Sequence, residues 1–163
     1  MAETSIEGIR RRGSGKRYFE IELVNYVADA GDTQAILFGL IGNGLSWTAG
    51  INGYGRGYVE GSEVWTPSVG LEAGDVVRVW HDIDTGQIWL GINDTVTGDP
   101  VAGTGPANPD DLLPTSVSDW RAYAKIPFFD SSNPPADTTT CRLRAKTSQF
   151  LLGPGAGWLP WED

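Results

Sequence analysis

The chain has 163 residues, and one compact domain with its own core accounts for that length. Its 22 glycines, 10 prolines and 7 tryptophans favour many short strands joined by turns over long helices. The formal net charge is −9, and between Tyr18 and Trp120 fifteen acidic side chains stand against two basic ones, Arg56 and Arg78, which excludes nucleic acid as the main partner.

The first predicted strand covers residues 16–26, where apolar and polar side chains alternate with the period of two of a half-buried strand. One face carries Phe19, Ile21 and Leu23, and the other carries Tyr18, Glu20 and Glu22. Residues 35–42 are apolar on both faces, which is typical of a central strand covered on both sides. The glycine-rich residues 43–66 are predicted to form turns and short strands that present side chains to solvent.

Residues 70–95 predict a β-hairpin. The segment Asp84-Thr85-Gly86 has the residue types of a tight turn, since glycine accepts a positive φ. One face of the two arms carries Val77, Val79, His81, Ile83, Ile88, Leu90 and Ile92, and the opposite face carries Arg78, Trp80, Asp82 and Trp89.

The only histidine of the chain, His81, lies in this hairpin beside Asp82. A catalytic triad or metal site needs the histidine and its carboxylate partner to converge, whereas adjacent residues of a strand point to opposite faces. No second histidine is present to complete a metal site. We therefore predict that His81 is a packed and hydrogen-bonded part of the scaffold.

The remaining chain predicts further strands and loops. Residues 98–115 are rich in glycine and proline and predict a long irregular loop, and 131–138 predict a turn. Residues 120–129 and 139–147 predict strands, and 148–163 form a closing segment with aromatic residues. No long helix or repeat is present, so residues 1–163 are expected to form a single antiparallel β-sandwich of the all-β class.

Other features narrow the cellular setting. The longest apolar stretch is too short to cross a bilayer, and the N-terminus lacks the apolar core of a signal peptide, so we expect synthesis in the cytoplasm without membrane insertion. Cys141 is the only cysteine, which excludes an intrachain disulfide and a cysteine-based zinc site. Basic residues gather near the two ends, at Arg10, Arg11, Arg12, Lys16 and Arg17 and at Arg142, Arg144 and Lys146, where we expect solvated strand faces or contacts to acidic neighbours.

Five motifs follow one another along nearly the whole chain. They are GKRYFEIEL (15–23), LFGLIG (37–42), INGYGRGYVEG (51–61), GDVVRVWHDIDTGQIWLGIND (74–94) and FLLGPGAGWLPW (150–161). In this order they resemble the SPRY family, also called B30.2-like. The resemblance implies a bent sandwich of two antiparallel sheets, a concanavalin A-like jelly roll related in architecture to legume lectins.

Two of these stretches are similar to one branch of that family. GDPVAGTGPA (98–107) resembles a glycine- and proline-rich insert of the SPRY-like domains carried by tailed bacteriophages, and the ending PGAGWLPW (154–161) resembles their closing segment. The resemblance therefore implies a phage or prophage virion protein more than an animal signalling adaptor.

Glu20 and Glu22 raise an enzymatic alternative. Two carboxylates at i and i+2 of a strand lie ~7 Å apart, within the ~6.5–9.5 Å separation of inverting glycosidases. The strand of lectin-like β-glucanases carries a central Asp and a further Glu, whereas this chain has Glu22 and then Val24 or Asn25. One of the two catalytic carboxylates is missing, so we expect both glutamates to be structural and no residue to be catalytic.

Aromatic residues in loops indicate binding. Trp47, Tyr54, Tyr58 and Trp65 lie in or beside the glycine-rich middle with Arg56, and Trp120 follows an acidic loop with Asp110, Asp111 and Asp119. Trp, Tyr and Arg carry hot spots of protein interfaces, and aromatic faces stack on sugar rings. We predict a contact surface with Tyr54, Arg56, Tyr58, Trp47 and Trp120 as its residues, whereas Trp80, Trp89, Trp158 and Trp161 are predicted to pack in the core.

The sequence therefore predicts a non-enzymatic module without metal or cofactor, a bacteriophage virion component such as a head or tail decoration, spike or fibre. Its partners would be other virion proteins or a host surface protein or glycan, and a symmetric homo-oligomer is compatible with such appendages. A lectin-like module that binds or cleaves glycans and an intracellular SPRY adaptor that grips a peptide are the alternatives.

Overall fold

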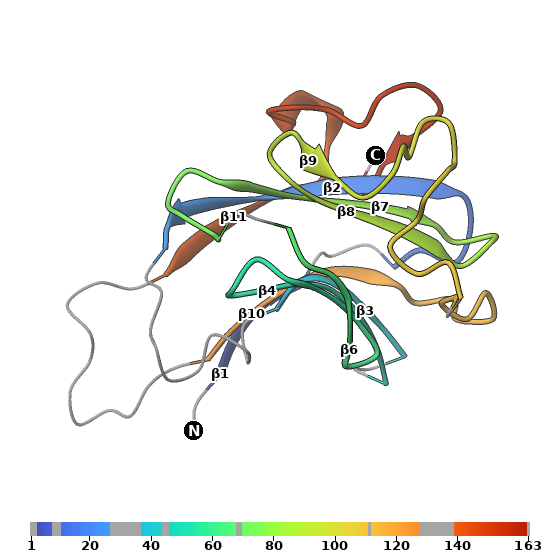
Figure 1. Ribbon diagram of the computed structural model, residues 1–163, viewed down its shortest axis with the longest axis horizontal. Coiled ribbons are helices and arrows are strands. Elements are labelled where there is room, and N and C mark those ends of the chain that lie inside the picture. The colour runs from blue at the N-terminus through green and yellow to red at the C-terminus, as the bar shows by residue number, and fades with distance from the viewer. Residues whose placement is uncertain are drawn as a thin grey trace.

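A computed structural model describes residues 3–7, 11–26, 37–43, 46–67, 70–110, 112–127 and 139–162. These residues form two packed antiparallel sheets, shown one above the other in Figure 1. The lower sheet has the order β1 (Glu3–Glu7), β10 (Arg121–Pro127), β3 (Leu37–Gly42), β4 (Trp47–Asn52), β5 (Gly57–Val59) and β6 (Ser62–Trp65). The upper sheet has the order β11 (Thr140–Arg144), β2 (Lys16–Asn25), β7 (Val76–Asp82), β8 (Gln87–Ile92) and β9 (Thr95–Val96), and β12 (Leu159–Pro160) pairs in parallel with β2.

The predicted all-β sandwich is confirmed. The described ranges contain one 3₁₀ turn, Thr147–Gln149, and no helix among them is long and apolar enough to cross a membrane. The predicted loop at 98–115 is irregular apart from a short bridge between Asp99 and Thr104, whereas the predicted turn at 131–138 lies outside the described residues.

The main core lies between the sheets, and the period-two pattern predicted it. Buried residues of the upper sheet alternate along β2, β7 and β8 and face the buried residues of β3, β4 and β10. They are Phe19, Ile21, Leu23, Val77, Val79, Ile88, Leu90 and Ile92 above, and Phe38, Leu40, Ala49, Ile51, Ala122 and Ala124 below. Their burial supplies the main hydrophobic stabilisation of the sandwich.

A third layer covers the outer face of the upper sheet. It consists of residues 97–106 and 146–158, which lie above β2, β7 and β8 in Figure 1 and are called the cover layer here. A second cluster of buried aromatic residues lies beneath it and includes Tyr18, Trp80, Trp89 and Trp158. The predicted burial of Trp80, Trp89, Trp158 and Trp161 is confirmed.

Indole N–H groups hold the cover layer on the sheet. Trp80 donates to the Pro154 carbonyl at 3.0 Å, and Trp89 donates to the Thr104 carbonyl at 3.0 Å. Trp158, itself in the cover layer, donates to the Pro100 carbonyl at 3.1 Å and so joins its two segments. Each of these three indoles thus has the hydrogen-bond partner that burial of its polar N–H requires, whereas the buried N–H of Trp120 has none among the described residues.

Glu20 is the polar centre of this layer. Its carboxylate is fully buried and accepts hydrogen bonds from the Tyr18 hydroxyl at 2.7 Å and from the backbone N–H groups of residues 151, 152 and 153 at 2.7, 3.0 and 2.9 Å. Arg78 donates to the Gly153 carbonyl at 2.6 Å and to the Tyr18 hydroxyl at 3.0 Å, and its guanidinium lies 4.5 Å from the Trp80 ring centroid. The buried charge is therefore fully hydrogen-bonded, as a buried carboxylate must be.

The predicted hairpin forms with Gly86 at φ 74°, and His81 points into the core, away from Asp82. The His81 side chain is 1% exposed, and its ring meets Trp120 edge to face at 4.9 Å and 84°. Its packing is confirmed. The predicted hydrogen bond is wrong, because neither ring nitrogen has a partner in the structure as described, and burial lowers the pKa of His81 to about 3.

Glu20→Gln is expected to lower the free energy of unfolding by ~2–4 kcal/mol, because an amide N–H₂ would face backbone N–H groups that then lose their acceptor. The matched change Glu22→Gln, in a partly exposed ion pair on the same strand, is expected to cost ~1 kcal/mol or less. Urea denaturation of both variants measures this difference. Equal stability of wild type and Glu20→Gln would contradict the role given to Glu20.

His81 is expected to make the fold acid-sensitive. The folded state keeps the ring neutral with a pKa near 3, whereas the unfolded chain has the ordinary value of 6.5 and takes up the proton first as the pH falls. Above about pH 6.5 the ring is neutral in both states and does not lower the stability. Between about pH 6.5 and pH 3 the free energy of unfolding falls as the pH falls, by at most ~1.4 kcal/mol per pH unit.

The variant His81→Phe keeps a flat ring against Trp120 and lacks the titrating group. It is expected to match the wild type within ~1 kcal/mol at pH 7 and to lose less stability between pH 7 and pH 4.5. Urea denaturation across that pH range measures the difference between the two proteins. Parallel pH profiles would show that protonation of His81 does not control acid stability.

Candidate functional site

The five predicted binding residues do not form one surface. Trp47 begins β4 opposite Gly42, and Asn52 ends it opposite Leu37. Five residue steps along a strand span ~16 Å, so Trp47 lies at one end of the sandwich and the hairpin with Tyr54, Arg56 and Tyr58 at the other. The acidic loop before Trp120 belongs to the Trp47 end, because Trp120 packs beside Gly42.

Trp120 was predicted as a surface residue, and that prediction is wrong. Its side chain is 0% exposed and packs in the main core against His81. The small residues Ala122 and Ala124 continue its face of β10, and Gly42 lies so close that an added Cβ would come within 2.8 Å of the Trp120 ring. These small neighbours leave space in the core for the large Trp120 ring, which is therefore not accessible to a binding partner.

The β4–β5 hairpin presents an ordered polar surface, here called the hairpin patch (Tyr54, Arg56, Tyr58 and Glu63). Tyr54 is 44% exposed, and the Arg56 side chain is about half exposed. The Asn52 side chain accepts the backbone N–H groups of Tyr54 and Arg56, each at 3.0 Å, and fixes the turn between them. The patch is therefore largely formed before any partner arrives.

Arg56 is one of only two basic residues between Tyr18 and Trp120 in the sequence, but it is not isolated in the structure. Its guanidinium lies 3.2 Å from a Glu63 carboxylate oxygen that also accepts the Tyr58 hydroxyl at 3.0 Å. Hydrogen bonds from Thr66 and Tyr58 lower the pKa of Glu63, and burial together with the Glu63 hydrogen bond raises the pKa of Tyr58. The sequence pattern gave no sign of Glu63, since register across β5 and β6 brings it there.

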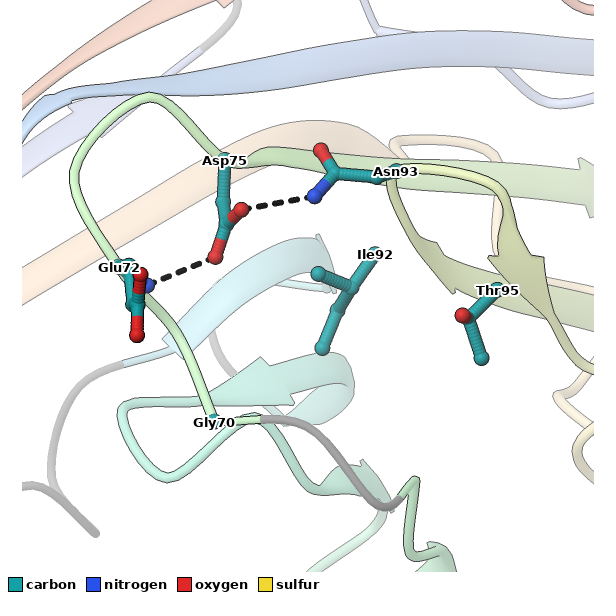
Figure 2. A pocket seen from close by; sticks show the side chains of 6 residues that line it. All are labelled: Gly70, Glu72, Asp75, Ile92, Asn93 and Thr95. Atoms are coloured by element: carbon teal, nitrogen blue, oxygen red, sulfur yellow. Dashed lines mark hydrogen bonds between the residues drawn. The ribbon is translucent and has the colours of Figure 1, made fainter.

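A pocket of about 360 Å³ lies at the end of the upper sheet, at the exposed loop before β7 (Figure 2). Its lining is Gly70, Glu72, Asp75, Ile92, Asn93 and Thr95. Figure 2 shows Asp75 bonded to the Glu72 backbone N–H and to the Asn93 side chain, both at 2.7 Å. Asn93, at φ 52°, also accepts the Val76 N–H at 2.9 Å. The fold uses these polar groups to hold the loop to the sheet.

A second pocket, of about 440 Å³, lies at the opposite end and is called the Trp47 pocket here. Its lining is Arg11, Asn43, Trp47, Pro114, Ser116, Val117, Ser118 and Asp119. Asp119 accepts the Asn43 backbone N–H at 2.7 Å, where Asn43 has φ 48°. Of the predicted acidic loop, Asp119 therefore contributes to a concave site, Asp110 is exposed, and Asp111 lies outside the described residues.

The carboxylates that suggested glycoside hydrolysis are engaged by the fold. Glu20 is buried under the cover layer, and Glu22 pairs with Arg142 at 3.1 Å and Arg144 at 2.6 Å. These two arginines thus contact an acidic neighbour, as expected from their alternation. Burial raises the pKa of the Cys141 thiol to about 11, which disfavours the reactive thiolate. In the described ranges, no three His, Cys, Asp or Glu side chains gather as metal ligands.

Comparison of the sequence with models of known protein families and with curated proteins finds no match in either case.

EDTA is expected to leave the melting temperature unchanged within about 1 °C, because a structural metal needs a converging set of charged ligands. Thermal unfolding with and without the chelator measures this. A drop of several degrees that calcium restores would identify a cation site that this reasoning misses, and the loop around Asp110 would then be the first place to search.

Proposed function

We propose that the chain is a non-enzymatic binding module and a virion component of a tailed bacteriophage or phage-like particle, a decoration, spike or fibre that contacts neighbouring virion proteins or the host surface. The β-sandwich agrees with the fold that the SPRY resemblance implies. The phage assignment rests on the resemblance of residues 98–107 and 154–161 to virion SPRY-like domains.

The two phage-type segments form one structural unit, which supports treating them together. Trp158 donates to the Pro100 carbonyl at 3.1 Å, and Gly155 lies against Val101, where an added Cβ would come within 2.5 Å of that side chain. Residues 98–106 and 154–158 of these segments belong to the cover layer on the outer face of the upper sheet. Their joint presence is therefore a coupled feature of the fold rather than two unrelated similarities.

The observation that carries the binding role is the hairpin patch. Its exposed Tyr54 and Arg56 are residue types that dominate interface energetics, and the Asn52 and Glu63 contacts hold them in place. Ordering a contact surface in advance lowers the entropy cost of association. By contrast, His81, Glu20 and Glu22 are buried or paired within the scaffold.

The double variant Tyr54→Ala/Arg56→Ala is expected to keep the melting temperature and to weaken association with particles or host cells by ~2 kcal/mol or more, about thirtyfold. Co-sedimentation with purified particles and binding to host cells measure the two contacts. The control Leu159→Ala/Arg142→Ala removes an exposed apolar side chain and an exposed cation elsewhere and is expected to bind normally.

Two outcomes would contradict this proposal. Native affinity of the double variant for both particles and cells would show that the hairpin patch is not the contact surface. Absence of the chain from intact purified particles would contradict the virion role and would favour the peptide-binding adaptor.

A further inference from the structure

The Trp47 pocket has the size and construction of a small-molecule site. Four separate parts of the chain meet there: Arg11 before β2, Asn43 after β3, Trp47 at the start of β4, and residues 114–119 before β10. Its volume of about 440 Å³ falls in the range of known ligand pockets, ~300–1,000 Å³. It lies away from the hairpin patch, at the other end of β4.

Much of the hydrogen-bonding capacity of the pocket is unused. Within the described part of the chain, the side chains of Arg11, Ser116 and Ser118 make no hydrogen bond or ion pair. Asp119 uses one carboxylate oxygen for the Asn43 backbone, which leaves the other oxygen available. Guanidinium N–H groups, two hydroxyls and a carboxylate oxygen therefore offer both donors and acceptors to a ligand.

In the two other polar surfaces, the central polar side chains are engaged within the protein. In the pocket of Figure 2, both oxygens of Asp75 and both side-chain polar atoms of Asn93 are bonded within the protein. In the hairpin patch, Arg56 and Tyr58 share one Glu63 oxygen. Arg11, Ser116 and Ser118 are exposed, so they hydrogen-bond water in the free protein and can bind a ligand without breaking an internal contact.

Charge and shape select the class of ligand. Arg11 and Asp119 place one positive and one negative charge on the lining, so a phosphate would meet Asp119 and an ammonium group would meet Arg11. A neutral polyol can accept from Arg11 and donate to Asp119 at the same time. Trp47 is half-buried, packs against the main core and also lines the pocket, so its ring is a fixed apolar surface for the C–H face of a sugar.

We propose that the Trp47 pocket binds one neutral saccharide unit. Asp119 accepts the backbone N–H of Asn43, which has a left-handed conformation, and so joins two separate parts of the lining. The proposal rests on the proposed function in one respect, because a contact with the host surface would supply the glycan. It assigns the sugar to a site separate from the hairpin patch.

The test uses the full chain labelled with ¹⁵N. D-Glucose, D-galactose, L-rhamnose and N-acetyl-D-glucosamine are titrated as neutral probes, with D-glucuronate and inorganic phosphate as anionic probes. The indole ¹H–¹⁵N signal of Trp47 reports occupancy of the pocket. At least one neutral sugar is expected to shift this signal in a saturable manner, and the anions are expected to bind at least tenfold more weakly.

Variants then locate the site. Arg11→Ala removes an exposed side chain without internal bonds, so the melting temperature is expected to persist while sugar affinity falls about tenfold or more. Trp47→Phe keeps packing against the core and is expected to weaken binding as well. Tyr54→Ala in the hairpin patch and Thr95→Val in the pocket of Figure 2 are the matched controls and are expected to bind the sugar normally.

The outcomes separate the two proposals. The saccharide site would be overturned if no neutral sugar gave a saturable shift or if a short peptide saturated the signal instead. It would also be overturned if phosphate or glucuronate bound more tightly than the sugars, or if Arg11→Ala left sugar binding unaffected. Loss of particle or cell contact in Tyr54→Ala/Arg56→Ala would still support the proposed function in those cases. If the double variant keeps both sugar binding and native particle contact, the role proposed for the hairpin patch would be wrong and the saccharide site would stand.

Discussion

The buried carboxylate of Glu20 is the constraint on which the upper half of the molecule depends. A charge in the interior is tolerated only when donors surround it. One of the four donors to Glu20 is the Tyr18 hydroxyl, and the other three are the consecutive backbone N–H groups of residues 151–153. The closing segment must therefore follow one path across the sheet. That path places Trp158 on the second aromatic cluster and next to residues 97–106. The central strands β7 and β8 are consequently buried on both faces.

This burial determines which polar and aromatic side chains remain exposed to a partner. The aromatic and charged side chains on the outer face of β2 and β7 pack against the cover layer or are hydrogen-bonded beneath it. They include Tyr18, Arg78 and Trp80. Exposed functional groups remain at the two ends of the sandwich, in the hairpin patch and the Trp47 pocket. Since β4 runs between them, a bulky partner at one end leaves the other accessible. Two ligands of different kinds can then bind without competing for the same side chains.

Alternation along β2, β7 and β8 predicted which residues share a face, and the Asp84-Thr85-Gly86 turn predicted the hairpin, because both depend on neighbours in sequence. What covers a face depends on distant residues. Glu20 meets residues 151–153 across more than 130 positions, and Arg56 meets Glu63 through the register of two short strands. The remote partner of a polar residue on the outer face cannot be identified from the sequence. A structural role of Glu20 was therefore predicted, but its burial and its hydrogen bonds to residues 151–153 were not.

Trp120 shows that an aromatic residue beside a predicted loop can belong to the core. The ring after the acidic loop is core, but its insertion beside Gly42 and Val117 fixes the position of the chain that precedes it. Val117 belongs to both the core and the lining of the Trp47 pocket, so the packing of Trp120 sets the wall on which Ser116, Ser118 and Asp119 are displayed. The buried aromatic residue supports this wall, and the small polar residues before it line the pocket. A wall held by a packed core gives the pocket its shape in the absence of ligand, which is the condition under which weak hydrogen bonds to a sugar can add up to specific binding.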